Sequence, residues 1–309
     1  MLYIAKETDR LGKTDDGNTV CDFDAEETKR KFSLSTAIAP LTWKGVKINL
    51  IDTPGYQDFS GEVAQGLRVA GTALIVMDAK SGVDVGSELA WEYATKARVP
   101  KAFFINKMDD ENANFGKAIE AMRIKFGNSV CPIEVPIIID RQLKGYVDLV
   151  TMKAYFWHDE TMGAEYSIEE IPANLRDEAE EWRDKMLETL AEFDEAFMEK
   201  YFDDPSTITV DEIKSAIRTA TLGMHVNPMT CGSSFKNKGV QALLDNVCAY
   251  LPSPADQGAI EGHEVGDPET IITRKPSADE PLAALAFKIA TDPYVGRLCF
   301  FRVYSGEMA

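Results

Sequence analysis

The sequence has few of the residues on which several common kinds of site depend. Its 309 residues include only 3 histidines, far apart along the chain, so a metal site held by a histidine cluster is not indicated. The cysteines are scattered and form no C-x-x-C pair: Cys21, Cys131, Cys231, Cys248 and Cys299. We therefore expect neither a disulfide framework nor a redox motif, but reduced cysteines in a cytoplasmic protein.

Basic residues and long apolar runs are scarce as well. Lys and Arg number 33 against 51 Asp and Glu, and the net charge of −18 argues against a surface that binds DNA through its phosphates. Residues 159–212 alone hold nineteen acidic and four basic residues. No apolar run is long enough to cross a bilayer and no signal peptide is recognisable, so no membrane contact is expected. With 45% hydrophobic residues, the chain can form the cores of up to three ordinary domains.

The stretch 46–56, V-K-I-N-L-I-D-T-P-G-Y, has the pattern of a buried strand that ends in a turn. Its strand ends at Asp52, and the turn consists of Thr53, Pro54, Gly55 and Tyr56. An acid at the carboxyl end of a parallel strand faces the crevice where α/β proteins bind ligands, and there it can hold the Mg²⁺ of a nucleotide. Gly55 has no Cβ atom, so its N–H can approach a phosphate oxygen. Taken alone, the pattern is more typical of a core strand with an ordinary Pro-Gly turn.

Two later stretches favour a nucleotide site. Residues 101–109, K-A-F-F-I-N-K-M-D, read as a buried strand followed by the loop Asn106, Lys107, Met108 and Asp109. Asn-Lys-x-Asp is the guanine-recognition pattern of GTPases, because the Asp109 carboxylate can accept both N–H donors on the guanine edge, which adenine does not offer. Residues 228–235 lead another strand into a loop that can line the base with Ser233, Ser234 and Phe235. The order of the three stretches, and the 54 residues from Asp52 to Asn106, fit one GTP-binding domain.

On these residues the sequence resembles the bacterial elongation factor G family of translational GTPases, in the branch that carries D-T-P-G-Y. The most specific segments are N-K-M-D at 106–109, G-S-S-F-K-N-K-G-V-Q at 232–241, L-P-S-P at 251–254 and D-P-Y-V-G-R-L at 292–298. The resemblance implies GTP and GDP as ligands together with Mg²⁺, the ribosome as partner through its stalk protein and ribosomal RNA, and a monomer. It assigns Mg²⁺ to Asp52, the γ-phosphate to Gly55, and the base to Asn106, Asp109 and residues 233–235.

The family's first switch is matched by residues 22–36. The family has an Arg-Gly-Ile-Thr run there, whose Thr hydroxyl holds Mg²⁺, whereas this sequence has Arg30-Lys31-Phe32-Ser33. The resemblance therefore implies Ser33 as the second metal ligand. Lys31 in place of Gly reduces the freedom of the backbone. Without the resemblance, the segment reads as a solvated basic turn.

The family's phosphate-binding loop is not found in the sequence. Gly12-Lys13-Thr14 resemble its end, but Glu7 stands where the first glycine is required, and a turn follows instead of a helix. By resemblance, residues 2–6 match the tail of the helix that follows the family's loop. We therefore expect the first strand and the phosphate loop to lie outside this chain. Two strands at the other end cannot close a barrel, so truncation is expected there too.

These features predict an α/β fold of the P-loop-GTPase type: a mainly parallel sheet with helices on both faces, an α+β insertion, and the start of a β-barrel domain. We expect helices at 57–70, 88–98, 115–126, 175–201, 211–219 and 240–250. We expect strands at 35–43, 46–51, 73–77, 101–106, 130–135, 145–152, 154–157, 228–231, 282–289 and 298–304. The expected division is a GTP-binding domain at 1–140, an acidic insertion at 141–226, the end of the GTP-binding domain at 227–254, a linker at 255–281 and the barrel start at 282–309.

Tyr56 stands where the family typically carries a His that orients the attacking water. A phenol has one hydroxyl with an ordinary pKa near 10, whereas imidazole titrates near neutrality, so slow hydrolysis is expected. Tyr56 can instead pack as an aromatic plug. Two alternatives to a translocation GTPase stay open: a ribosome-binding pseudo-GTPase without turnover, and a ribosomal protection protein of the tetracycline-resistance type.

Overall fold

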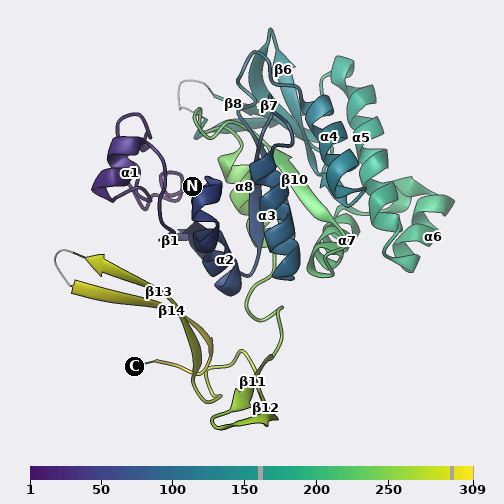
Figure 1. The fold of residues 1–309 in the computed structure, drawn as a ribbon. Coiled ribbons are helices and arrows are strands. Elements are labelled where there is room, and N and C mark those ends of the chain that lie inside the picture. The colour runs from purple at the N-terminus through teal and green to yellow at the C-terminus, as the bar shows by residue number, and fades with distance from the viewer. Residues whose placement is uncertain (159–162, 293–295, 309) are drawn as a thin grey trace.

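A four-stranded parallel sheet forms the centre of the molecule. The computed structural model describes residues 1–158, 163–292 and 296–308; part of the D-P-Y-V-G-R-L segment, residues 293–295, lies outside them. The sheet has the order β3 (Ala73–Asp78), β4 (Lys101–Asn106), β10 (Asn227–Cys231) and β5 (Val130–Pro132). Helices flank it, chiefly α3 (Val85–Lys96), α4 (Phe115–Phe126) and α8 (Val240–Tyr250) (Figure 1). The predicted α/β class is thereby confirmed.

The strand that carries Asp52 lies outside this parallel sheet. Strand β2 (Val46–Asp52) pairs antiparallel with β1 (Ala37–Trp43) around the turn at Lys44 and Gly45, which agrees with the strands predicted at 46–51 and 35–43. Among the described residues, however, this pair forms a sheet of its own. Its inner face packs against α8 and residues 1–5, while its other face is exposed. The prediction of a buried parallel strand is therefore wrong at β2, because its side chains alternate between core and solvent.

The insertion is an antiparallel sheet covered by helices. Its strands are β6 (Glu134–Ile139), β7 (Gln142–Asp148), β8 (Lys153–Trp157) and β9 (Tyr166–Glu169), in that order. The single strand predicted at 130–135 is wrong, because β5 joins the parallel sheet and β6 joins the antiparallel one. The single helix predicted at 175–201 is also wrong. Asp194 accepts a hydrogen bond from the Phe197 amide and starts a new helix, which divides the segment into α5 (Ala173–Ala191) and α6 (Glu195–Asp203).

The remaining elements are two C-terminal hairpins and five further helices of the described residues. The C-terminal part consists of two hairpins, β11 (Ile260–Glu264) with β12 (Asp267–Arg274), and β13 (Ala283–Asp292) with β14 (Gly296–Ser305). Strands were predicted at 282–289 and 298–304, within the second hairpin, whereas the first hairpin lies in the stretch expected to be a linker. The other helices are α1 (Ala25–Arg30), the short η1 (Gln57–Phe59), α2 (Ser60–Val69), the short η3 (Pro205–Thr207) and α7 (Val210–Leu222). The domain boundaries stay a prediction.

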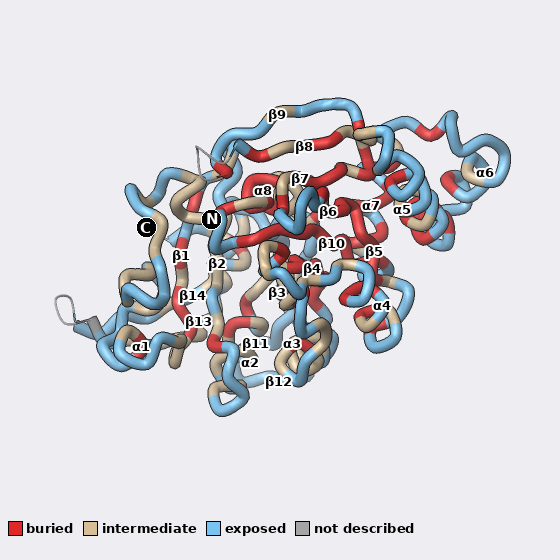
Figure 2. Tube along the Cα trace, turned by 90° about the horizontal axis from the view of Figure 1, so that it is seen from above, coloured by how far each residue is buried: buried red, intermediate tan, exposed pale blue. Residues whose placement is uncertain are grey.

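The core is concentrated in the parallel sheet and the insertion. Figure 2 shows buried residues along β4, β10 and β7, whereas the two C-terminal hairpins are mostly exposed. Phe103 and Ile105 of β4 are fully buried, and Phe103 stacks on Phe126 of α4 and on Trp91 of α3. This packing fixes the carboxyl ends of β3, β4 and β10, from which the loops of the site emerge. Within the described ranges, no helix combines the length and the apolar character that crossing a bilayer requires.

Candidate functional site: two loop groups

The two loops predicted to bind guanine are joined by direct hydrogen bonds. The Asn106 side-chain oxygen, at the end of β4, accepts from the backbone N–H of Ser234 at 2.9 Å and from its hydroxyl at 3.1 Å. The backbone N–H of Met108 donates to the Gly232 carbonyl at 3.1 Å, and the Met108 side chain is buried. Segments more than a hundred residues apart in the sequence thus form one loop cluster at the sheet edge.

Gly232 allows the second loop to close tightly. A Cβ atom at this position would lie 2.3 Å from the Lys238 carbonyl oxygen, a distance that no side chain tolerates. Ser233 is fully buried, exchanges backbone hydrogen bonds with Lys238, and accepts from the Lys236 amide at 3.2 Å through its hydroxyl. Ser233 therefore shapes the loop from inside, and Ser234 and Phe235 form its outer surface.

Two side chains of the cluster are open to a ligand. Asp109 is half-buried, and in the described part of the chain its carboxylate has no hydrogen bond or ion pair. Phe235 is 64% exposed, with the Lys236 ammonium near its ring. An unpaired carboxylate beside an exposed aromatic ring can accept hydrogen bonds from a planar heterocycle and pack against its face.

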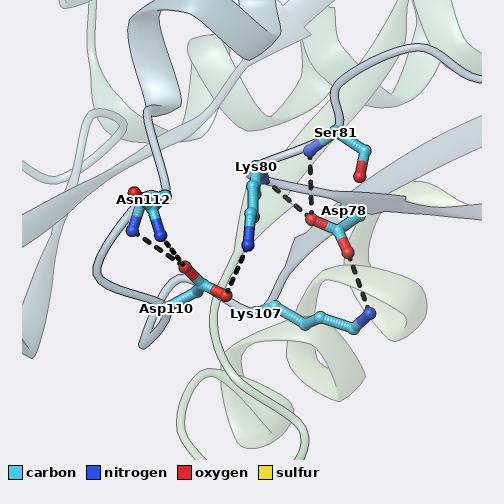
Figure 3. A network of polar contacts seen from close by, with 6 residues as sticks. All are labelled: Asp78, Lys80, Ser81, Lys107, Asp110 and Asn112. Atoms are coloured by element: carbon cyan, nitrogen blue, oxygen red, sulfur yellow. Dashed lines mark hydrogen bonds and ion pairs between the residues drawn. The ribbon is translucent and has the colours of Figure 1, made fainter.

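A second carboxylate, missed by the sequence analysis, holds the Asn-Lys loop (Figure 3). Asp78 ends β3 and accepts from the Lys107 ammonium at 2.8 Å and from the backbone N–H groups of Lys80 and Ser81. Burial acts to raise the pKa of Asp78, but these donors outweigh it and hold the pKa below its ordinary value. Lys107 has a φ of 58°, a left-handed conformation that costs energy for a side chain with a Cβ, and the ion pair helps to keep it there. An acid directly after a buried strand is the signal that could have found Asp78.

The Asp52 carboxyl group lies among other acids and a thiol. Cys21 donates a hydrogen bond to it, and Asp22 and Glu27 are near enough to repel it. Burial of the carboxyl group, with repulsion from Asp22 and Glu27, raises the pKa of Asp52, although the hydrogen bond from Cys21 opposes this. Burial and the neighbouring acids raise the pKa of the Cys21 thiol to about 12, so Cys21 acts as a neutral donor.

The predicted first switch forms a compact segment next to Asp52. Ser33 donates its hydroxyl proton to Asp22 at 2.6 Å. Lys31 takes a φ of 64° at the end of α1, so it adopts the left-handed conformation that the family's Gly would favour. Lys31 therefore takes the backbone conformation of this position although it is not a glycine.

Tyr56 reaches the same segment. Its ring centroid lies 4.6 Å from that of Phe32, with the rings tilted by 49°, although 56% of Tyr56 remains exposed. Pro54 is buried, Thr53 is partly buried near α2, and the space where a Cβ of Gly55 would point is open. In the described ranges, no hydrogen bond or ion pair connects this group with the Asn106–Ser234 cluster.

The expected metal ligands supply oxygen donors, the type that Mg²⁺ prefers. Ser33 gives its proton to Asp22, which leaves its oxygen lone pairs for a cation, and Asp52 offers a carboxylate. The donor set therefore fits a cation that also binds phosphate. Across the part of the chain that the structure describes, no three His, Cys, Asp or Glu side chains form a cage for an ion by themselves.

Comparison with known proteins places this geometry in a family. The sequence model described as the elongation factor Tu GTP binding domain matches residues 1–253. The chain is 44% identical over 321 aligned positions to elongation factor G of Amoebophilus asiaticus (strain 5a2), with all of this chain and 45% of that protein covered. A crystal structure of a protein from Thermus thermophilus matches it with a TM-score of 0.85 at 28% identity, covering 99% of this chain and 42% of that one.

A match over residues 1–253 and this identity over the whole chain show the family. The chain belongs to the translational GTPases built on the elongation factor Tu GTP-binding domain, in the elongation factor G branch. It spans less than half the length of the curated relative and of the solved structure that it matches.

Proposed function

We propose that the chain is the guanine-nucleotide part of an elongation-factor-G-type GTPase that binds GTP and GDP with Mg²⁺ and acts on the ribosome in translocation. The observation that supports this most strongly is the joining of Asn106 to Ser234, which leaves Asp109 unpaired at the same loop cluster. Asn106 and Lys107 hold the loops, Asp109 accepts the two guanine N–H donors, and residues 233–235 line the base.

The phosphate side of the proposed site is the group around Asp52. Asp52 and Ser33 would hold the Mg²⁺, which neutralises charge on the phosphates when bound. The open space at Gly55 supports an approach of its N–H to the γ-phosphate. The loops that carry Ser33 and Gly55 are the elements that such a switch would release after hydrolysis.

Hydrolysis is proposed to be slow. The contact of Tyr56 with Phe32 supports a packing role for the phenol, and its single hydroxyl is a poor substitute for a group that titrates near neutrality. The same observation favours the second candidate, a ribosome-binding pseudo-GTPase that works by binding and release.

For the partner, we propose the ribosome, through its flexible stalk protein and ribosomal RNA. The acidic insertion, with nineteen acids between residues 159 and 212, would be the part that docks the stalk protein. Most of these acids lie on solvated helix faces, so the contact would involve a minority of them.

Competition binding tests the proposed nucleotide. The 309-residue chain is titrated with GTP and ATP in the presence of Mg²⁺, and binding is followed by NMR shifts of Asn106 and Ser234. GTP should bind at least about tenfold more tightly than ATP, since the unpaired Asp109 can pair with guanine only. Equal affinities, or shifts remote from these residues, would refute the proposal.

A further inference from the structure

Four consecutive residues at the end of the first-switch segment each donate a hydrogen bond to an acidic side chain. The Ser33 hydroxyl donates to Asp22 at 2.6 Å. The backbone N–H groups of Leu34 and Ser35 donate to one oxygen of Glu27, at 2.9 and 3.0 Å. The backbone N–H of Thr36 donates to Glu62 of α2 at 2.6 Å. The segment is therefore positioned by three carboxylates.

Glu27 is the central member of this set. Only 1% of it is exposed, and its second oxygen accepts from the Asp24 backbone N–H at 3.2 Å, which also closes the start of α1. The negative charge of a buried carboxylate that accepts from three backbone N–H groups is stabilised without a cation. In turn, the carboxylate holds the peptides that donate to it in place. Because these peptides directly follow Ser33, Glu27 sets where the Ser33 side chain points.

Asp22 acts on the hydroxyl itself. By accepting its proton, Asp22 orients the Ser33 oxygen so that the lone pairs are free, as the outer hydrogen-bond partner of a metal ligand does. Asp22 is in turn held by the Thr19 hydroxyl at 3.0 Å, and its carbonyl accepts from the Thr28 hydroxyl at 3.3 Å. The orientation of Ser33 thus depends on two acids that carry no metal-binding role themselves.

We propose that Glu27 and Asp22 are positioning residues for Ser33: Glu27 fixes the backbone of residues 34 and 35, and Asp22 takes the hydroxyl proton, so that the Ser33 lone pairs would be available to Mg²⁺. The positioning itself is independent of any nucleotide, and only its consequence for Mg²⁺ rests on the proposed function.

Amide hydrogen exchange of the nucleotide-free 309-residue chain tests the first step. In Glu27→Ala, the amides of Leu34 and Ser35 should exchange roughly tenfold faster, because both lose a charged acceptor. In Glu27→Gln they should be largely rescued, since the remaining amide oxygen can accept both bonds. Glu26→Gln is the matched control, because Glu26 is the exposed neighbour that pairs with Arg30. The β4 amides report global stability.

Wild-type exchange at residues 34 and 35 in Glu27→Ala would overturn the proposal, and so would equal acceleration of the β4 amides. The second step is tested with Asp22→Ala, which removes the acceptor of the Ser33 hydroxyl, against Asp22→Asn, which keeps an acceptor oxygen. The quantity compared is the Mg²⁺ concentration that gives half of the Mg²⁺-dependent gain in GTP affinity. This Mg²⁺ concentration should be severalfold higher in Asp22→Ala than in Asp22→Asn, since both variants lose the charge and only the first loses the acceptor. If exchange responds to Glu27 but the Mg²⁺ requirement ignores Asp22, then the assignment of Ser33 to Mg²⁺ fails and Glu27 remains a positioning residue for the backbone alone.

Discussion

Replacing Glu134 with Gln should stabilise the protein at neutral and alkaline pH. Glu134 begins β6 at the junction between the insertion and the parallel sheet, and only 3% of it is exposed. It accepts from the Asn246 side-chain amide at 2.8 Å and, over a longer 3.5 Å, from the Cys231 backbone N–H. Burial, with repulsion from Asp148 and Asp245, outweighs these bonds and raises the pKa of Glu134 from 4.5 to about 8.

The sign of the effect follows from proton binding. Below pH 4.5, Glu134 is protonated in the folded and the unfolded chain alike, so stability does not depend on its titration. Between that pH and about pH 8 the folded chain retains the proton that the unfolded chain has lost, so stability falls as pH rises. A shift of this size is worth about 3 kcal/mol of stability between about pH 5 and pH 8.

Urea unfolding at a series of pH values measures the contribution of Glu134 to the pH dependence of stability. Because Gln is neutral and keeps an acceptor oxygen for Asn246, the gain in unfolding free energy of Glu134→Gln over wild type should grow from near zero at about pH 5 to about 3 kcal/mol at about pH 8. Glu178→Gln, at an exposed site of α5, is the control and should show no such growth. A difference between wild type and Glu134→Gln that stays constant over this range would refute the reasoning.

Three further predictions concern the nucleotide site. The 309-residue chain, which contains no G-x-x-x-x-G-K-[S/T] motif, should bind GTP weakly, and micromolar affinity in calorimetry would contradict this. In a version extended by a phosphate-binding loop, Tyr56→His should increase ribosome-stimulated GTP hydrolysis; wild-type hydrolysis as fast as that of the variant would show that the phenol is not limiting. Asp78→Asn should weaken GTP binding a few-fold, since it removes the ion pair with the largely exposed Lys107, which is worth at most about 1 kcal/mol. Asp110→Asn is the comparison, because its ion pair with Lys80 is longer at 3.7 Å, and an equal loss in both variants would argue against a special role of Asp78.

End signals gave accurate boundaries for some elements but not for all: α3 was expected from residue 88, whereas Asp84 caps it and it begins at Val85. Helix α4 begins and ends where expected, since Asn114 accepts from the Lys117 amide at its start and Gly127 follows its last turn. Where a periodic pattern continued through a break, the prediction was wrong. The apolar positions of α5 and α6 keep their three- and four-residue spacing across Asp194, so only the cap shows the division.

The site was predictable to the extent that short local motifs encode it. Asn-Lys-x-Asp and the Ser-rich loop are recognisable alone, and the structure joins them at Asn106 and Ser234. Cys21 beside Asp52, and Glu27 beneath residues 34 and 35, could not be foreseen, because these contacts depend on how residues 21–35 fold back on themselves and on β2. A hairpin of exposed polar strands such as β11–β12 is equally hard to distinguish from a linker, because neither strand shows a buried face.

The central claim is that Asp109 recognises guanine, and a change of base tests it most directly. Xanthine presents an acceptor where guanine presents a donor, so Asp109→Asn should exchange the preference from GTP to XTP. The quantity measured is the ratio of the GTP and XTP affinities of the same chain. This ratio can be compared between variants even where each affinity is weak. We predict that wild type favours GTP at least about tenfold and that Asp109→Asn reverses the ratio; an unchanged ratio in the variant would show that Asp109 does not contact the base.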